Sequence, residues 1–211
     1  MKIQLVNDAK IAENDFHTLV VASEYFANIV AKAWGQSAVT VSQDAGDWTL
    51  YVTDLHRHLG AAGYHTVENG KPVAYVSPKS CGVQVFGQYT PSKYLKSIKK
   101  TIAERYVSGL ITVICHEIAE VMCDPDIATL SSKDASGRTW LVEVGDHAFG
   151  GFFNKTFFGK LCVFPDITTP AFYDLNGKAP FSIANLLTGP FKMSPKGYAY
   201  YKDQFGRLVK F

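Results

Sequence analysis

The chain has 211 residues, of which 47% are hydrophobic and 13% aromatic, a composition that supports one well-packed core. Its formal net charge of +2 creates no general field for nucleic acid or for a membrane, and the basic run 93–100 is typical of a solvated helix face. Residues 1–8 lack the apolar segment of a signal peptide, and no window approaches a membrane span. We therefore expect a single cytoplasmic domain over residues 1–211 that binds neither nucleic acid nor membrane.

The cysteines give no sign of covalent cross-linking. They show no CxxC spacing and are too sparse for a disulfide scaffold, so we expect free thiols. We also expect no internal repeats, because no segment of the chain is evidently duplicated. The four cysteines are Cys81, Cys115, Cys123 and Cys162.

The N-terminal part of the chain predicts a strand followed by a long helix. Residues 3–6 are typical of a short edge strand. Residues 14–34 have apolar side chains at helical spacing, with Asn14 or Asp15 as a suitable N-cap and Gly35 as a stop. This first helix is long enough to cover much of a small sheet.

Three further segments predict strands. Residues 39–41 and 48–55 are rich in β-branched and aromatic residues, and the turn-forming residues between them predict that the two strands are adjacent. A third strand over 72–76 lies between Pro72 and Pro78, which favours the edge of a sheet. An edge strand beside a cleft could pair with an extended peptide.

The central helix carries the most reactive side chains. Residues 114–123 have helical periodicity, and Asp124-Pro125 follows directly and ends the helix. At about 100° per residue, Glu120 lies about 40° from His116 and Glu117 about 100° from it. The opposite side is an apolar stripe that faces the core. That stripe consists of Leu110, Ile111, Ile114, Ile118, Val121 and Met122.

This motif predicts a metal site. A His and a carboxylate at i and i+4 can bind one metal ion, and Glu117 then stands beside the open position as a general base. Cys123 lies near His116 on the wheel, but a small buried residue is the more common role for such a thiol. The alternative interpretation of the whole motif is a surface helix whose His116 and glutamates bind no metal.

A third ligand could come from an acidic cluster downstream. Residues 139–144 alternate as a strand in which Glu143 points away from its apolar neighbours, whereas Asp146 follows Gly145, where the chain can turn. We favour Asp146 as the ligand, with Glu143 either as a hydrogen-bonding support or as the alternative ligand.

The remaining segments complete an α+β prediction. Residues 94–106 have the pattern of a basic helix, residues 131–138 that of a polar loop, and the chain after Phe149 that of irregular structure with short strands. We expect a small mixed or antiparallel sheet packed on the long N-terminal helix and the central helix. The sheet and the site helix would lie within about residues 1–125, and the third ligand would come from about residues 126–211.

Several motifs in fixed order strengthen this prediction. They resemble a family of largely uncharacterised bacterial and phage proteins, similar to zincin-type metallopeptidases with an HExxE helix, over most of residues 14–200. Gly145 stands where Cys is common in that family and Cys123 where Ala is common, so the resemblance implies no thiol ligand. The motifs are Trp34-Gly35, Leu59-Gly60-Ala61-Ala62-Gly63-Tyr64-His65, Asn69-Gly70-Lys71-Pro72, His116-Glu117-x-x-Glu120 with Asp124-Pro125, and Glu143-Val144-Gly145-Asp146.

The resemblance implies a zincin-like fold and a zinc-dependent hydrolase of peptide bonds in peptides or proteins. His116 and Glu120 would bind Zn²⁺ together with Asp146 or Glu143, and Glu117 would take a proton from a metal-bound water. With one His and two carboxylates, the site activates water less strongly than a two-His site. His65, in a glycine-flanked loop, would hydrogen-bond an oxyanion, or would simply be an exposed turn residue.

A structural protein is the main alternative to an enzyme. A phage virion component could keep the zincin-like fold as a scaffold, with a non-catalytic metal or none, and contact other virion proteins. The segment 89–106 is extra length relative to the family and could be a docking surface. A peptide-binding module that uses the strand at 73–76 is a third interpretation, and it predicts binding that survives chelation.

Overall fold

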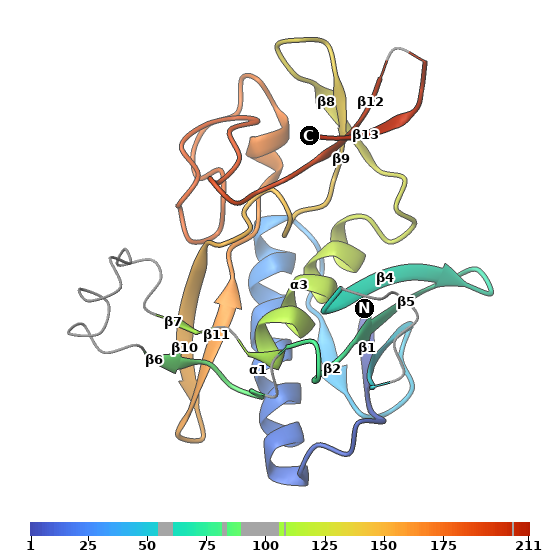
Figure 1. Ribbon diagram of the computed structural model, residues 1–211, viewed down its shortest axis with the longest axis vertical. Helices are drawn as coiled ribbons and strands as arrows, with labels where there is room; N and C mark the ends of the chain where they lie inside the picture. Colours follow the sequence, from blue (N-terminus) through green and yellow to red (C-terminus); the bar gives the residue numbers. More distant parts are fainter. Residues whose placement is uncertain (55–60, 82–83, 90–105, 108, 204) are drawn as a thin grey trace.

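The computed structural model describes residues 1–54, 61–81, 84–89, 106–107, 109–203 and 205–211. Within these ranges the chain forms two α-helices and several small sheets, which confirms the predicted α+β class (Figure 1). No described helix is long and apolar enough to cross a membrane. The basic run 93–100 and nearly all of the helix predicted at 94–106 lie outside the described residues. Tyr106 belongs to the short strand β7 (Tyr106–Val107).

The largest sheet has five strands in the order β2-β1-β3-β5-β4. β1 runs parallel to β2 and β3, and β3 runs parallel to β5, whereas β4 is antiparallel to β5. The sheet is therefore mixed, with its antiparallel strand at one end. The bounds are Lys2–Asn7 for β1, Thr40–Ser42 for β2, Trp48–Val52 for β3, Gly63–Glu68 for β4 and Lys71–Val76 for β5.

Three predictions about strand order are wrong. β1 lies inside the sheet rather than at its edge, and it separates β2 from β3, which were expected to be adjacent. The helix between β1 and β2 makes a parallel crossover, which local sequence patterns do not reveal. β5 is also internal. Pro72 is tolerated in it because β5 pairs with β3 only from Val73 onward, so this pairing does not need the N–H group that Pro72 lacks.

The first helix, α1, spans Glu13–Ala33, within a residue of the predicted range. Its buried face packs against the second helix and against a hairpin from the C-terminal part. The predicted N-cap at Asn14 or Asp15 is wrong, because the helix begins after Ala12, which makes no side-chain cap. Gly35 has a φ of +65°, in the left-handed region that suits a residue just past a helix end.

The central helix, α3, spans Leu110–Cys123 and is surrounded by other elements. It lies between the five-stranded sheet and the strand β11 (Lys160–Pro165), with α1 across it (Figure 1). Within α3, only Val113 and His116 are not buried. The surface-helix alternative is therefore wrong, because apolar neighbours cover this helix on nearly every side.

Local contacts fix both ends of α3. The Thr112 hydroxyl accepts a hydrogen bond from the Gly109 N–H at 3.3 Å and donates one to the Val163 carbonyl at 2.7 Å. At the other end, the Asp124 carboxylate accepts hydrogen bonds from the backbone N–H groups of Ala128 and Thr129. These bonds hold the helix in register with β11 and direct the chain into its C-terminal part.

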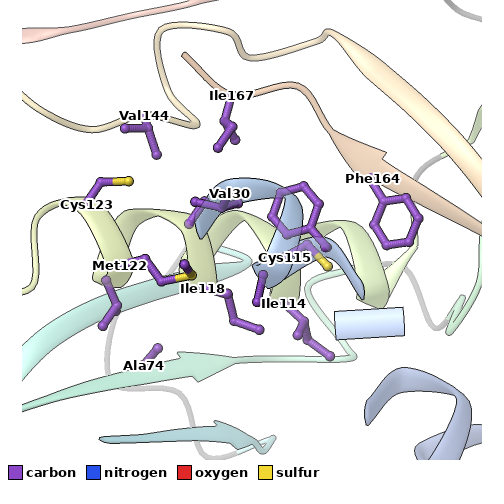
Figure 2. Packing of buried hydrophobic residues seen from close by; sticks show 14 of the residues in the cluster. Val30, Ala74, Ile114, Cys115, Ile118, Met122, Cys123, Val144, Phe164 and Ile167 are labelled. Atoms are coloured by element: carbon purple, nitrogen blue, oxygen red, sulfur yellow. The ribbon is translucent and has the colours of Figure 1, made fainter. Parts of the chain in front are cut away.

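Figure 2 shows how the core positions this helix. Ile114 and Ile118 of α3 point into the packed interior. Ala74 of β5 lies on one side of the helix, and Val144 and Ile167 lie on the other. The core therefore joins the sheet to the C-terminal part across α3, which makes the helix a rigid support for its polar side chains.

The C-terminal part contains more regular structure than the sequence predicts. β10 (Phe152–Phe157) and β11 form an antiparallel hairpin, and four strands form a second sheet in the order β13-β12-β9-β8. The prediction of a polar loop at 131–138 is wrong in part, because its first residues belong to β8. The strand predicted at 139–144 is shorter than expected and ends at Leu141. The bounds are Leu130–Lys133 for β8, Thr139–Leu141 for β9, Tyr200–Lys202 for β12 and Leu208–Lys210 for β13.

Two hairpins of this second sheet, β8–β9 and β12–β13, are near copies of each other. We call them the twin hairpins. Both turns have the sequence Lys-Asp-x-x-Gly-Arg, at 133–138 and 202–207. Asp134 and Asp203 each accept hydrogen bonds from the N–H groups two and four residues later. The turn glycines have φ values of +83° and +76°. The expectation of no internal repeat is therefore wrong.

Candidate metal centre

Helix α3 places three ionisable side chains together. His116 and Glu120 lie one helical turn apart, with 3.0 Å between His116 Nε2 and Glu120 Oε1, as the spacing of the motif predicts. Glu117 lies beside them and faces the start of β4, where a Cβ on Gly63 would come within 2.6 Å of Glu117 Oε1. Only 3% of Glu117 and 5% of Glu120 is exposed. Two carboxylates are thus held inside the protein by one rigid helix.

The loop after β9 brings Asp146 to the same point. Asp146 Oδ1 lies 3.2 Å from His116 Nε2, so this ring nitrogen faces two carboxylates. Gly145 allows this approach, since a Cβ at that position would lie only 2.5 Å from His116 Nδ1. The backbone of the loop therefore packs directly on the imidazole ring.

The geometry of these three side chains fits a metal ion. Atoms of His116, Glu120 and Asp146 that could serve as ligands lie within 4.8 Å of one another. Tetrahedral ligands about 2.1 Å from zinc are about 3.4 Å apart, close to the 3.0 and 3.2 Å between Nε2 and the two oxygens. Glu120 Oε1 and Asp146 Oδ1 are buried and have no hydrogen-bond partner among the described residues. Because such oxygens are unfavourable when uncompensated, a cation would suit this group.

A second group adjoins the first. His65, from β4, places its Nδ1 3.7 Å from Glu117 Oε2 and 3.6 Å from Glu120 Oε2. His65, Glu117 and Glu120 therefore form another set of side chains that could hold a metal ion. The expectation of a loop or exposed turn at His65 is wrong, because the residue lies in a strand and is 8% exposed. Its contact with the two carboxylates favours a role beside them over an oxyanion role.

Glu143, the alternative third ligand, is buried nearby but belongs to neither group. Burial, together with the negative charge of Glu120, raises the pKa of Glu143 to about 9. No atom of Glu143 lies within ligand distance of the His116, Glu120 and Asp146 group or of the His65, Glu117 and Glu120 group. The geometry favours Asp146 over Glu143 as the third ligand.

Charges in the centre are strongly coupled. Burial alone would lower the pKa of His65, but the carboxylates of Glu117 and Glu120 outweigh it and raise the pKa to about 11. Burial raises the pKa of Glu117, against the opposing effect of His65. In the metal-free protein, a proton on His65 thus supplies part of the positive charge that the carboxylates require.

The residues of the first group respond in the same way. The pKa of His116 is raised well above its ordinary value, because the charges of Glu120 and Asp146 overcome its burial. Burial would raise the pKa of Glu120, but the charge of His116 lowers it instead. The pKa of Asp146 is raised by its burial and by the charge of Glu120. These shifts identify Glu120 as the carboxylate that is most firmly ionised.

Tyr198 is a member of the site that the sequence analysis did not single out. It hydrogen-bonds to Asp146, and its burial and the charge of Asp146 raise its pKa. The hydroxyl therefore stays protonated and donates to the carboxylate. Tyr198 precedes β12, about fifty residues after Asp146, and no local pattern links the two.

Two other candidates have structural roles. Cys123 belongs to neither candidate group, and burial, with the charges of Glu120 and Asp124, raises the pKa of its thiol. His147 is fully buried, and its Nδ1 lies 2.7 Å from the Tyr173 hydroxyl, away from the two metal-binding groups.

A pocket of about 470 Å³ opens onto the centre. His116 and Glu117 line it together with Gly63, Gly145 and Tyr198, whereas Glu120 and Asp146 lie behind this wall. Such a pocket can admit a small ligand or part of a chain. The site as a whole is a buried cluster of histidine and carboxylate side chains that could hold a metal ion and that faces a cavity.

Comparison of the chain with protein-family models, with curated proteins and with solved structures finds no match.

Proposed function

We propose that this protein is a zinc-dependent metallopeptidase of the zincin type, related to the HExxE family that its motifs resemble. The observation that carries the proposal is the convergence of His116, Glu120 and Asp146, with Glu117 beside them at the pocket wall. One imidazole and two carboxylates are a ligand set that zinc accepts, and three protein ligands leave a position open for chemistry. A zinc ion held there would act as a Lewis acid for amide hydrolysis.

Glu117 is the proposed general base. Its Oε1 lies beside Gly63 at the pocket, and burial raises its pKa, which brings a carboxylate closer to the range in which it exchanges protons at neutral pH. Glu117 would accept a proton from the attacking water and pass it to the leaving nitrogen. His65, on the other side of the carboxylate, holds Glu117 in position through their opposite charges.

Substrate binding is proposed at the edge of the five-stranded sheet. Among the described strands, β4 is the last one on this side of the sheet. Gly63 at its start lines the pocket, together with Ala61 and Ala62. An extended peptide added to β4 by backbone hydrogen bonds would pass over Glu117. The strand predicted for this role, at 73–76, is internal, so β4 replaces it.

The decisive experiment compares the wild type with Glu117→Gln. Both proteins should retain zinc at His116, Glu120 and Asp146, measured by elemental analysis. Cleavage of a peptide library should fall about 10²- to 10⁴-fold in the variant, the usual contribution of a positioned general base. The exposed Glu13 provides a control, and Glu13→Gln should cleave like the wild type. Metal in both proteins with equal absence of cleavage would exclude the peptidase, and no metal in either would exclude the site.

A virion structural protein remains the second candidate, and exposed apolar side chains favour it. Phe205, Leu208 and Phe211, in the C-terminal hairpin, are 72%, 54% and 58% exposed. Apolar groups gathered on one hairpin are typical of a surface that contacts other proteins. In this case the fold would serve as a scaffold and the Glu117→Gln variant would assemble normally. Assembly that fails only in Phe205→Ser or Phe211→Ser would support this candidate.

A further inference from the structure

We propose that the centre holds two divalent cations bridged by Glu120, one with His116 and Asp146 and the other with His65 and Glu117. This inference rests on the proposed metal site and extends it to a second ion. The two groups of ligand atoms adjoin each other and share only Glu120.

The two oxygens of Glu120 are divided between the two groups. Oε1 faces His116 Nε2 at 3.0 Å, and Oε2 faces His65 Nδ1 at 3.6 Å. A carboxylate whose oxygens point to two different ligand sets is the bridging arrangement of two-metal sites, in which the ions lie about 3.5–4 Å apart. Glu120 is 5% exposed and rigidly held on α3, so the division is a property of the fold.

The contacts of His65 are charge pairs without a hydrogen bond, and their lengths also fit a shared ligand set. A protonated imidazole would donate a hydrogen bond of about 2.8 Å to one carboxylate. Instead, Nδ1 lies almost equally far from Glu117 Oε2 and Glu120 Oε2, at 3.7 and 3.6 Å. Those separations are too long for hydrogen bonds and close to the distance of about 3.4 Å between tetrahedral ligands of one ion.

Glu117 supplies an independent sign that the second group needs a partner. Its Oε2 is buried, has no hydrogen-bond partner among the described residues, and is the oxygen that faces His65. The residue is 3% exposed, so water does not readily solvate the charge. A cation between the three side chains would compensate this oxygen and would leave Oε1 directed at the pocket for proton transfer.

The ligand types suggest which cations to test. Each set provides one imidazole nitrogen and two carboxylate oxygens, and these donors suit Zn²⁺ and also the harder Mn²⁺. Glu117, Glu120 and Asp146 together carry three negative charges when ionised, and one divalent ion leaves one of them uncompensated. A second ion would remove that deficit without a proton on His65.

Metal stoichiometry tests the proposal without any assay of activity. The full-length wild type, His65→Asn and a control, Asp166→Asn, are dialysed against Zn²⁺ or Mn²⁺ and analysed for metal per chain and by titration calorimetry. Asp166 is a buried carboxylate outside both groups. We expect two ions in the wild type and in Asp166→Asn, and one in His65→Asn. Electron spin resonance of the Mn²⁺-loaded wild type should show two exchange-coupled ions, and that of His65→Asn a single isolated ion.

Each result has one interpretation. One ion in both the wild type and His65→Asn would overturn the second site and leave the proposed peptidase standing. Two ions in both would place the second ion elsewhere and also overturn the inference. No ion in the wild type would overturn the proposed function together with it. Should His65→Asn fail to fold, as judged by circular dichroism, an uncoupled Mn²⁺ signal in the wild type overturns the two-ion site.

Discussion

The turn of the first twin hairpin and the candidate metal centre both bury a carboxylate, and they compensate it in opposite ways. Asp134 is 7% exposed and accepts hydrogen bonds from the Ser136 N–H and hydroxyl, the Arg138 N–H and Nε, and Trp140 Nε1. Glu120 is equally buried, but its Oε1 has no hydrogen-bond partner among the described residues. One carboxylate is satisfied by its own neighbours in the sequence, and the other is not.

The difference separates a carboxylate with a structural role from one that is a candidate ligand. A buried acid that receives several donors stabilises a turn and needs nothing else. Glu120 Oε1, Asp146 Oδ1 and Glu117 Oε2 are buried without a hydrogen bond among the described residues, and only histidine charges face them. Natural folds retain such an arrangement where a ligand supplies the missing interaction, and here that ligand would be a cation.

The largest expected effect is the loss of metal from Glu120→Gln. Because Glu120 contributes to both proposed ion sites, the affinity for zinc should fall by more than about 100-fold, beyond the loss of about 10- to 100-fold that follows removal of a supporting partner. Titration calorimetry measures this affinity for zinc. Glu143→Gln is the matched control and should change the affinity by less than about 10-fold, since Glu143 is buried nearby but belongs to neither candidate group. Equal losses in both variants would transfer the ligand role to Glu143.

At the turn that contains Asp134, we expect a loss of stability without a loss of metal. Asp134→Ala leaves the Trp140 Nε1 donor and backbone N–H groups without an acceptor, so the free energy of unfolding should fall by roughly 2–4 kcal/mol. Metal content should not change. Urea denaturation measures the loss, and Asp203→Ala is the comparison, because the Asp203 side chain is more exposed than that of Asp134 and should contribute less. A large loss of metal from Asp134→Ala would contradict the separation of the two regions.

The two regions should also respond oppositely to pH. In the metal-free protein the pKa of His65 is raised to about 11 and that of Glu143 to about 9, so the folded state binds more protons than the unfolded state at pH 6.5–9. Its stability should therefore fall as pH rises, by about 1.4 kcal/mol per pH unit for each extra proton. The pKa of Asp134 is lowered by its hydrogen bonds, which outweigh its burial, so its contribution is present above its ordinary pKa and lost in acid.

Denaturant titrations of the chelated protein at pH 6.5 and pH 9 measure this dependence. Saturating zinc should reduce it, since a metal ion replaces the protons of the centre. Stability that rises between these pH values in the chelated protein would show that the carboxylates and histidines do not share protons as the structure indicates.

Local patterns in the sequence are enough to predict the helix and the candidate ligands that it brings together. The i, i+4 spacing of His116 and Glu120 depends only on helical geometry, and the turn at Gly145 pointed to Asp146. The hydrogen-bonded Tyr198 and the position of His65 beside Glu117 could not be predicted in this way. Both depend on which strands are neighbours, and strand order is a non-local property.

The sheet shows the same limit. The segments of β1, β2, β3 and β5 were recognised from composition, but their order was not, because the crossover through α1 places β2 on the far side of β1. The repeated Lys-Asp-x-x-Gly-Arg turns were visible in the sequence and could have predicted the twin hairpins. Their mechanism is local, since one aspartate binds the backbone of its own turn.

Two glycine variants should each weaken one of the two proposed ion sites, and this effect should be smaller. In Gly145→Ala the new Cβ would lie 2.5 Å from His116 Nδ1 and displace the imidazole, so affinity at the site of His116 should fall about 10-fold, as for loss of a supporting contact. In Gly63→Ala the Cβ would instead meet Glu117 Oε1 at 2.6 Å. That variant should weaken the site of His65 and spare the other. Calorimetry resolves the two steps, and identical traces from both variants would contradict two separate positions.

The smallest effect is expected at Cys123, which lies on α3 close to the ligands but remains protonated. Cys123→Ala removes one buried sulfur, so the free energy of unfolding should fall by only about 1 kcal/mol. Zinc affinity should stay within about 2-fold of the wild type, because Cys123 belongs to neither group of side chains that could hold the ion. Substituting Co²⁺ for zinc gives a second readout, since a sulfur ligand produces an intense near-ultraviolet charge-transfer band. If the wild type shows that band and Cys123→Ala does not, Cys123 binds the metal ion and the prediction is wrong.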